Sequence, residues 1–168
     1  MKKLTTKKIV VTAILASMSL ITFLIENLFP PLFIPGAKMG LSNIFVLLAI
    51  LLTDFTCSLS VLLIKVLLGS IFGGSLSSLM FSLPAGLISF IIQYLMINFF
   101  SKRFSLIAIC VASAILHNIV QCIVYALITD VISLIYLPYL STIGVVSGLI
   151  VGFATILLVK FLPQRFIS

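Results

Sequence analysis

The chain has 168 residues, of which 62% are hydrophobic and only 8% are charged, and its formal net charge is +7. Soluble domains carry about 25% charged residues, so this composition excludes an ordinary soluble domain and indicates an integral membrane protein. The basic residues flank apolar runs and form no clustered solvent-facing patch, so the positive charge does not indicate nucleic-acid binding.

Apolar stretches recur along the whole chain, and a transmembrane helix needs about 20 such residues. In chain order we expect spans at residues 8–28, 39–55, 57–72, 77–100, 104–129 and 138–162. The third span is short, and the Gly/Ser-rich loop after it is a candidate for a re-entrant segment, which is tolerated only inside protein or beside a cavity. The sequence therefore predicts an all-α integral membrane protein, a six-transmembrane-helix bundle forming a single domain over residues 1–168.

The basic residues predict the orientation of the bundle. Eight of the ten lie at the two termini or in the 101–103 turn: Lys2, Lys3, Lys7, Lys8, Lys102, Arg103, Lys160 and Arg165. Positive charge concentrates on the cytoplasmic side of short loops, and six spans place both termini on the same side. We therefore expect a multi-pass protein of the cell membrane with both termini inside (N-in, C-in).

Small residues four apart predict where helices approach closely. The sixth span carries Gly144, Gly148 and Gly152, and we expect this run to pack against another helix of the bundle. The first span carries two pairs, Ala13 with Ser17 and Thr12 with Ala16. For the first span, packing within the bundle and docking of a partner protein remain equally open.

Polar residues form a stripe on the fifth span. Ser113, His117, Gln121 and Tyr125 recur every four residues, with Asn118 beside them. This spacing keeps the side chains on one slowly turning helix face, and His117 falls near the middle of the span. Hydrogen bonds between helices contribute about 0.6 kcal/mol each, and packing alone would need fewer polar groups than this stripe contains. We therefore favour a stripe that faces a ligand or is linked to proton transfer.

Lys65 lies deep in the third span, too far from the surface for its side chain to cover the roughly 15 Å to the headgroups. Asp54 and Asp130 lie at span ends and Glu26 lies near the outer end of the first span, so we expect none of them to neutralise Lys65. A buried lysine without a partner either loses its proton or binds an anion. We favour an anion, because ionisable residues within a membrane are functional by default.

The segment 35–43, PGAKMGLSN, introduces the second span. Pro35 and Gly36 form a turn, and Lys38 adds positive charge where free backbone N–H groups at a helix start attract anions. Anchoring at the membrane surface is the alternative for Lys38. Asn43, about one turn deeper, favours a binding site.

Enzyme motifs are missing from the sequence. Prenyl-chain condensation needs clustered carboxylates to hold magnesium, whereas the two aspartates, Asp54 and Asp130, lie far apart. A single histidine and three scattered cysteines provide no zinc-ligand spacing, and no P-loop is present. We expect no catalytic residues, no metal and no cofactor.

Four segments together resemble one family: PGAKMGLSN (35–43), IKVLLGSIFGGSLSSLMFSLPAG (64–86), ILHNIVQ (115–121) and the glycine-containing segment 137–152. The chain resembles heptaprenyl diphosphate synthase component I, also called the Gx transporter family. This resemblance implies a fold like the substrate-binding S component of energy-coupling-factor transporters, with six helices and an outward-facing pocket. It also implies these ligand-binding positions: Lys38, Asn43, Lys65, Gly69, Ser70, His117, Asn118 and Gln121. Many relatives have arginine in place of Lys65. Lysine keeps the positive charge of arginine, but it cannot bind an anion in the bidentate way that a guanidinium does.

The resemblance leaves two functions open. In the first, the protein is a membrane subunit that captures a small, anionic ligand, such as a quinone or isoprenoid precursor, while a partner module with ATPases supplies energy. In the second, it is a non-catalytic membrane anchor for a soluble polyprenyl diphosphate synthase in menaquinone-type biosynthesis.

Overall fold

The computed structural model describes residues 6–28, 40–73, 76–129 and 137–162, and these residues form helices and short turns. The helices are α1 (Thr6–Leu28), α2 (Asn43–Leu52), α3 (Phe55–Phe72), α4 (Leu76–Phe100), α5 (Leu106–Thr129) and α6 (Leu137–Phe161). All of these except α2 are long and apolar enough to cross a membrane. The described residues are thus helical apart from short turns, and five of their helices fit the predicted multi-pass membrane protein.

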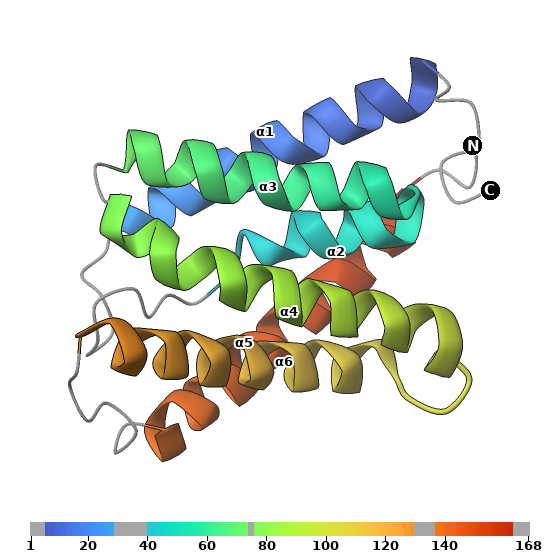
Figure 1. Ribbon diagram of the computed structural model, residues 1–168. Helices are drawn as coiled ribbons and strands as arrows, with labels where there is room; N and C mark the ends of the chain where they lie inside the picture. Colours follow the sequence, from blue (N-terminus) through green and yellow to red (C-terminus); the bar gives the residue numbers. More distant parts are fainter. Residues whose placement is uncertain (1–5, 29–39, 74–75, 130–136, 163–168) are drawn as a thin grey trace.

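Successive helices run in opposite directions, so the helix ends gather at two ends of the bundle (Figure 1). The beginning of α1, the α2–α3 and α4–α5 turns and the end of α6 lie at one end, which we call the terminal end. The ends of α1, α3 and α5 lie at the opposite, distal end. The terminal end carries the described basic residues apart from Lys65: Lys7, Lys8, Lys102, Arg103 and Lys160.

Helix α2 is shorter than the span predicted for residues 39–55. It contains 10 residues, which is about 15 Å of helix and about half of a 30 Å hydrocarbon core. A turn precedes it, in which Gly40 has a positive φ of 70° and its carbonyl accepts from the N–H of Asn43 at 2.9 Å. The pattern of apolar residues does not reveal this turn, so the span predicted from the sequence is longer than the helix.

The short helix lies inside the bundle. Residues 46–50 of α2 are all buried, and α2 packs against α1, α3 and α6. A helix that is apolar on every side has to be covered on every side. The remaining neighbours, α1 with α3, α3 with α4, α4 with α5 and α5 with α6, complete the enclosure. The start of α2 is thereby held within the bundle and away from its surface.

The glycines of α6 pack against the backbone of α5. A Cβ atom added at Gly148 would lie 2.5 Å from the Cα of Val111, and one at Gly144 would lie 3.0 Å from the Cα of Ile115. The predicted packing of this run within the bundle is confirmed. On α1 the two small-residue pairs differ, because Ala16 is buried whereas Ala13 and Ser17 are exposed.

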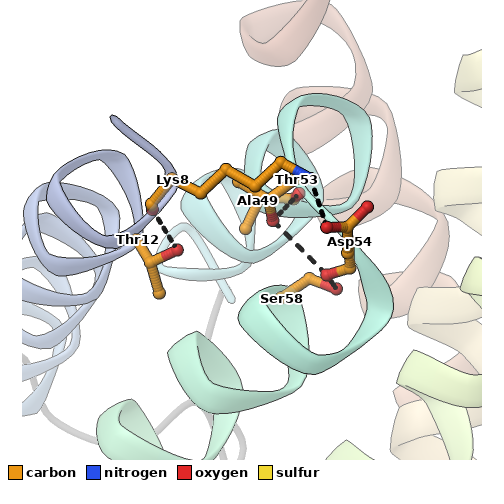
Figure 2. A network of polar contacts seen from close by, with 6 residues as sticks. All are labelled: Lys8, Thr12, Ala49, Thr53, Asp54 and Ser58. Atoms are coloured by element: carbon orange, nitrogen blue, oxygen red, sulfur yellow. Dashed lines mark hydrogen bonds and ion pairs between the residues drawn. The ribbon is translucent and has the colours of Figure 1, made fainter. Parts of the chain in front are cut away.

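A polar network joins the beginning of α1 to the α2–α3 turn (Figure 2). The Lys8 ammonium pairs with a carboxylate oxygen of Asp54. The backbone carbonyl of Asp54 in turn accepts from the Ser58 hydroxyl at 3.1 Å. Both members of the ion pair are partly exposed, so the pair contributes about 0–1 kcal/mol. Its main effect is to fix where α1 begins relative to the turn.

Gly148→Ala should destabilise the protein relative to Gly86→Ala. Both changes remove a mid-helix glycine, but the new Cβ at Gly86 would meet Leu62 at an ordinary 3.5 Å, whereas that at Gly148 would overlap the backbone of Val111. We expect Gly148→Ala to be less stable by about 1–3 kcal/mol, measured by thermal unfolding in detergent. Equal midpoints for the two variants would contradict the close α5–α6 packing.

Candidate functional site

A partly open cavity with many polar residues in its wall lies next to the start of α2. Its volume is about 60 Å³, enough for about four water molecules. All six helices or their flanking turns contribute to its wall. Its polar lining residues are Glu26, Ser42, Asn43, Lys65, Ser82, His117, Asn118, Gln121 and Ser147. We call this space the first cavity.

The structure brings most of the predicted site residues to the first cavity. Five of them line it: Asn43, Lys65, His117, Asn118 and Gln121. These residues come from α2, α3 and α5, which are separated by up to 78 positions in the chain. Residues distant in the chain thus meet around one cavity, at the start of α2 and on the facing sides of α3 and α5.

The other predicted residues have different places. Gly69 packs against α1, where an added Cβ would lie 2.4 Å from Cδ1 of Phe23, and Phe23 itself lines the first cavity. The Ser70 hydroxyl donates to the carbonyl of Leu67 at 2.8 Å. Lys38 lies outside the described residues. Gly69 therefore shapes the cavity through Phe23 without lining it.

Lys65 points into the protein. Its exposed fraction is 5%, and its ammonium donates a hydrogen bond to Oδ1 of Asn43. Asn43, the first residue of α2, thus binds Lys65 of α3, and both residues line the first cavity. The Lys65 side chain therefore does not extend to the surface of the bundle, in agreement with the expectation that it lies too deep to reach the headgroups.

The polar stripe of α5 divides between packing and cavity. Nδ1 of His117 lies 3.3 Å from the hydroxyl oxygen of Ser89 on α4, and Asn118 donates to the carbonyl of Leu140 on α6 at 2.9 Å. Tyr125 makes an edge-to-face contact with Phe81, with ring centroids 5.2 Å apart. Tyr125 therefore joins helices together, whereas His117 and Asn118 both contact a neighbouring helix and line the first cavity.

Glu26 lines the first cavity, although the sequence did not identify it as a candidate site residue. It is 9% exposed, and its carboxylate accepts from the backbone N–H of Leu41 at 2.6 Å and of Ser42 at 3.4 Å. Ser19 of α1 adds a hydrogen bond from its hydroxyl to the Ser42 carbonyl at 2.9 Å. The anion expected at the start of α2 is thus present as a side chain of α1, favoured there by the positive end of the helix.

The sequence predicts Glu26 near the outer end of its span, too far away to neutralise Lys65, whereas the structure places both residues at one cavity. Glu26 lies close to the end of its own helix, and that is why the sequence placed it near the surface. Because α2 begins inside the bundle, the end of α1 meets it there. An acid in an otherwise apolar span was the signal that could have identified it.

Polar contacts connect the two charges in series. Glu26 binds the N–H groups before α2, α2 begins at Asn43, and Asn43 accepts from Lys65. In these contacts each charge has a neutral partner, a backbone amide or a side-chain amide. The site therefore holds an ammonium and a carboxylate in one cavity, in fixed positions set by the start of α2.

Comparison with known proteins identifies the family of the chain. The model of the family described as heptaprenyl diphosphate synthase component I matches residues 15–158, and the chain belongs to this family. Neither the curated proteins nor the solved structures yield a match.

Replacing Glu26 should loosen the start of α2. Glu26→Ala leaves the half-buried N–H of Leu41 and the buried N–H of Ser42 without their acceptor, at a cost of about 1–3 kcal/mol for an unsatisfied buried group. We expect a lower midpoint of thermal unfolding and faster hydrogen–deuterium exchange over residues 40–46. Glu26→Gln retains an uncharged acceptor and should fall between the wild type and Glu26→Ala. Unchanged exchange in this segment for Glu26→Ala would contradict the capping role.

Proposed function

We propose that this member of the family is a non-catalytic membrane subunit that binds a small, anionic ligand in the first cavity. The observation that carries the proposal is a lysine, Lys65, with an exposed fraction of 5% on the wall of a polar cavity that also holds His117 and Gln121. Burying a charge is expensive, and within a membrane such residues are functional by default.

The charges around the cavity favour an oxyanion as the ligand. Glu26 directs its two oxygens at backbone N–H groups of residues 41 and 42, so the positive end of α2 offsets its charge. An anion entering the cavity meets the ammonium of Lys65 in a medium less polar than water, where opposite charges attract more strongly. Ser42, Asn43 and Gln121 add hydrogen-bonding groups to the same wall.

The size of the cavity limits what can enter it. Room for about four waters in a volume of about 60 Å³ is enough for a carboxylate or phosphate head group. The family description names a synthase of heptaprenyl diphosphate, an isoprenoid with an anionic head. A quinone or isoprenoid precursor, bound through its anionic group, fits both considerations.

The proposed orientation places the terminal end in the cytoplasm of a cell membrane. Lys102, Arg103 and Lys160 are exposed at that end, which follows the positive-inside rule. Glu26 lines the first cavity and lies in the last turn of α1, the helix that ends at the distal end. The cavity would then receive its ligand from outside the cell.

A partner would supply energy for transport. The sequence carries no nucleotide-binding motif, so an energy-coupling module with ATPases would have to dock on the bundle. The face of α1 that carries Ala13 and Ser17 is exposed, and small residues of this kind permit close contact with another helix. This face is the proposed docking surface for the module.

Lys65→Ala should abolish binding of anionic ligands. The assay is the shift in thermal unfolding midpoint of the purified protein with inorganic diphosphate, geranyl diphosphate or an aromatic carboxylate. Loss of a buried charge partner costs about 2–5 kcal/mol, so affinity should fall by about thirtyfold or more. Lys65→Arg should retain part of the shift, and the exposed Lys102→Ala should retain all of it. A full shift with Lys65→Ala would refute the proposal.

The second candidate function is a membrane anchor for a soluble polyprenyl diphosphate synthase. The family description, a component of such a synthase, and the exposed basic residues at the terminal end favour it. If it is correct, coexpressed synthase should sediment with membranes, and Lys102→Glu with Arg103→Glu should release it into the soluble fraction. Lys65→Ala should leave this association intact. A synthase that stays soluble beside the wild-type protein would exclude this function.

A further inference from the structure

A second, smaller cavity adjoins the first. Its volume is about 30 Å³, room for about two water-sized groups. Three polar residues line both cavities and therefore lie where the two meet: Asn43, His117 and Ser147. Helices α4 and α5 supply the polar and thiol side chains that line the second cavity alone: Ser89, Gln93, Cys110 and Ser113. The second cavity therefore offers a polar wall next to the proposed ligand site.

An apolar cluster closes the second cavity toward the terminal end. Leu47, Cys110 and Val151 form this cluster, and Ile97 and Leu106 pack on it. Leu106 is the first residue of α5, next to the α4–α5 turn at that end of the bundle. The polar lining thus ends inside the protein. The second cavity is therefore the inner end of the first, and it suits the end of a bound ligand.

The walls of the two cavities differ in charge. The first contains Lys65 and Glu26, whereas the described residues that line the second include no lysine, arginine, aspartate or glutamate. A charged group placed in the second cavity would be buried without an opposite charge, which is costly. The part of a ligand that enters it is therefore uncharged, while the anionic group stays at Lys65.

The hydroxyl groups of the second cavity direct their hydrogens to backbone carbonyls. Ser113 donates to the carbonyl of Ser89 at 3.3 Å, and Ser89 donates to that of Gly86 at 3.1 Å. A hydroxyl has one hydrogen and two acceptor positions, so each oxygen can still accept. The Gln93 amide, which hydrogen-bonds the thiol of Cys110, has further donor and acceptor positions. This wall therefore matches a ligand group that donates hydrogen bonds, such as a hydroxyl.

We propose that the second cavity is a specificity subsite that selects small anions with an uncharged hydroxyl group at the end opposite the anionic group. This inference rests on the proposed function, and it favours a hydroxylated precursor over one with a hydrocarbon tail. A methyl or prenyl group in the second cavity would leave the Gln93 amide and the serine oxygens facing hydrocarbon. A site that hydrogen-bonds a ligand hydroxyl discriminates against the analogue without it, because its polar groups are then unpaired.

The test is the affinity of the purified full chain for matched aromatic carboxylates, measured by isothermal titration calorimetry in detergent. Para-hydroxybenzoate and para-hydroxycinnamate carry a hydroxyl opposite the carboxylate at two lengths, and para-methylbenzoate and para-methylcinnamate carry a methyl in its place. At one length or both, the hydroxyl compound should bind at least about tenfold more tightly than its methyl counterpart. Equal affinities within both pairs, or tighter binding of the methyl compounds, would overturn the proposal.

Variants of the second cavity should remove this preference without removing binding. Gln93→Leu and Ser113→Ala take hydrogen-bonding groups from its wall, so each should weaken binding of the preferred hydroxyl compound by about threefold to tenfold. Binding of the methyl compound should stay the same or become tighter. Ser101→Ala, an exposed site in the α4–α5 turn, is the matched control and should change neither affinity. A full preference in both cavity variants would contradict the subsite.

The outcomes separate this inference from the proposed function. Lys65→Ala should weaken binding of both members of each pair, because it acts on their common carboxylate. Equal binding within each pair that Lys65→Ala abolishes would refute the subsite and leave the proposed function standing. If none of the four compounds binds, the subsite is refuted, and the shifts with inorganic diphosphate and geranyl diphosphate decide whether the proposed function falls with it.

Discussion

The hydrogen bonds from the N–H groups of Leu41 and Ser42 to Glu26 are the interaction on which the site depends. A helix that begins inside a bundle exposes N–H groups that have no partner within the helix, and in a membrane there is no bulk water to satisfy them. The carboxylate of α1 supplies the acceptor. This contact permits α2 to be a short, internal helix, and the internal start of α2 creates the space that the first cavity occupies.

The position of Asn43 follows from the same contact, and the position of Lys65 follows from Asn43. Because Lys65 is already held in position, the free-energy cost of rearranging it around the proposed ligand would be small, which is the advantage of a preorganised site. The enclosure of α2 by α1, α3 and α6 and the close α5–α6 packing at Gly148 keep the wall in place. Stability and the proposed binding thus depend on one arrangement.

The sequence predicted the features that depend on local pattern. Apolar length identified the long helices, and depth along a helix identified Lys65 and His117 as interior residues. The features it missed depend on where helices meet. The turn at Gly40 shortens α2, and the packing of α1 on that turn makes Glu26 an interior residue. Similarly, Gly69 lies in the segment 64–86 that resembles the family, but its contact with Phe23 is visible only in three dimensions.

The most direct test of this account is an experimental structure of the full chain in a lipid nanodisc. The account predicts that the ammonium of Lys65 lies on Asn43 inside a polar cavity, with Glu26 on the backbone N–H groups of residues 41 and 42. An α2 that continues to the distal surface as a full-length span, with Lys65 directed to the lipid headgroups, would contradict it.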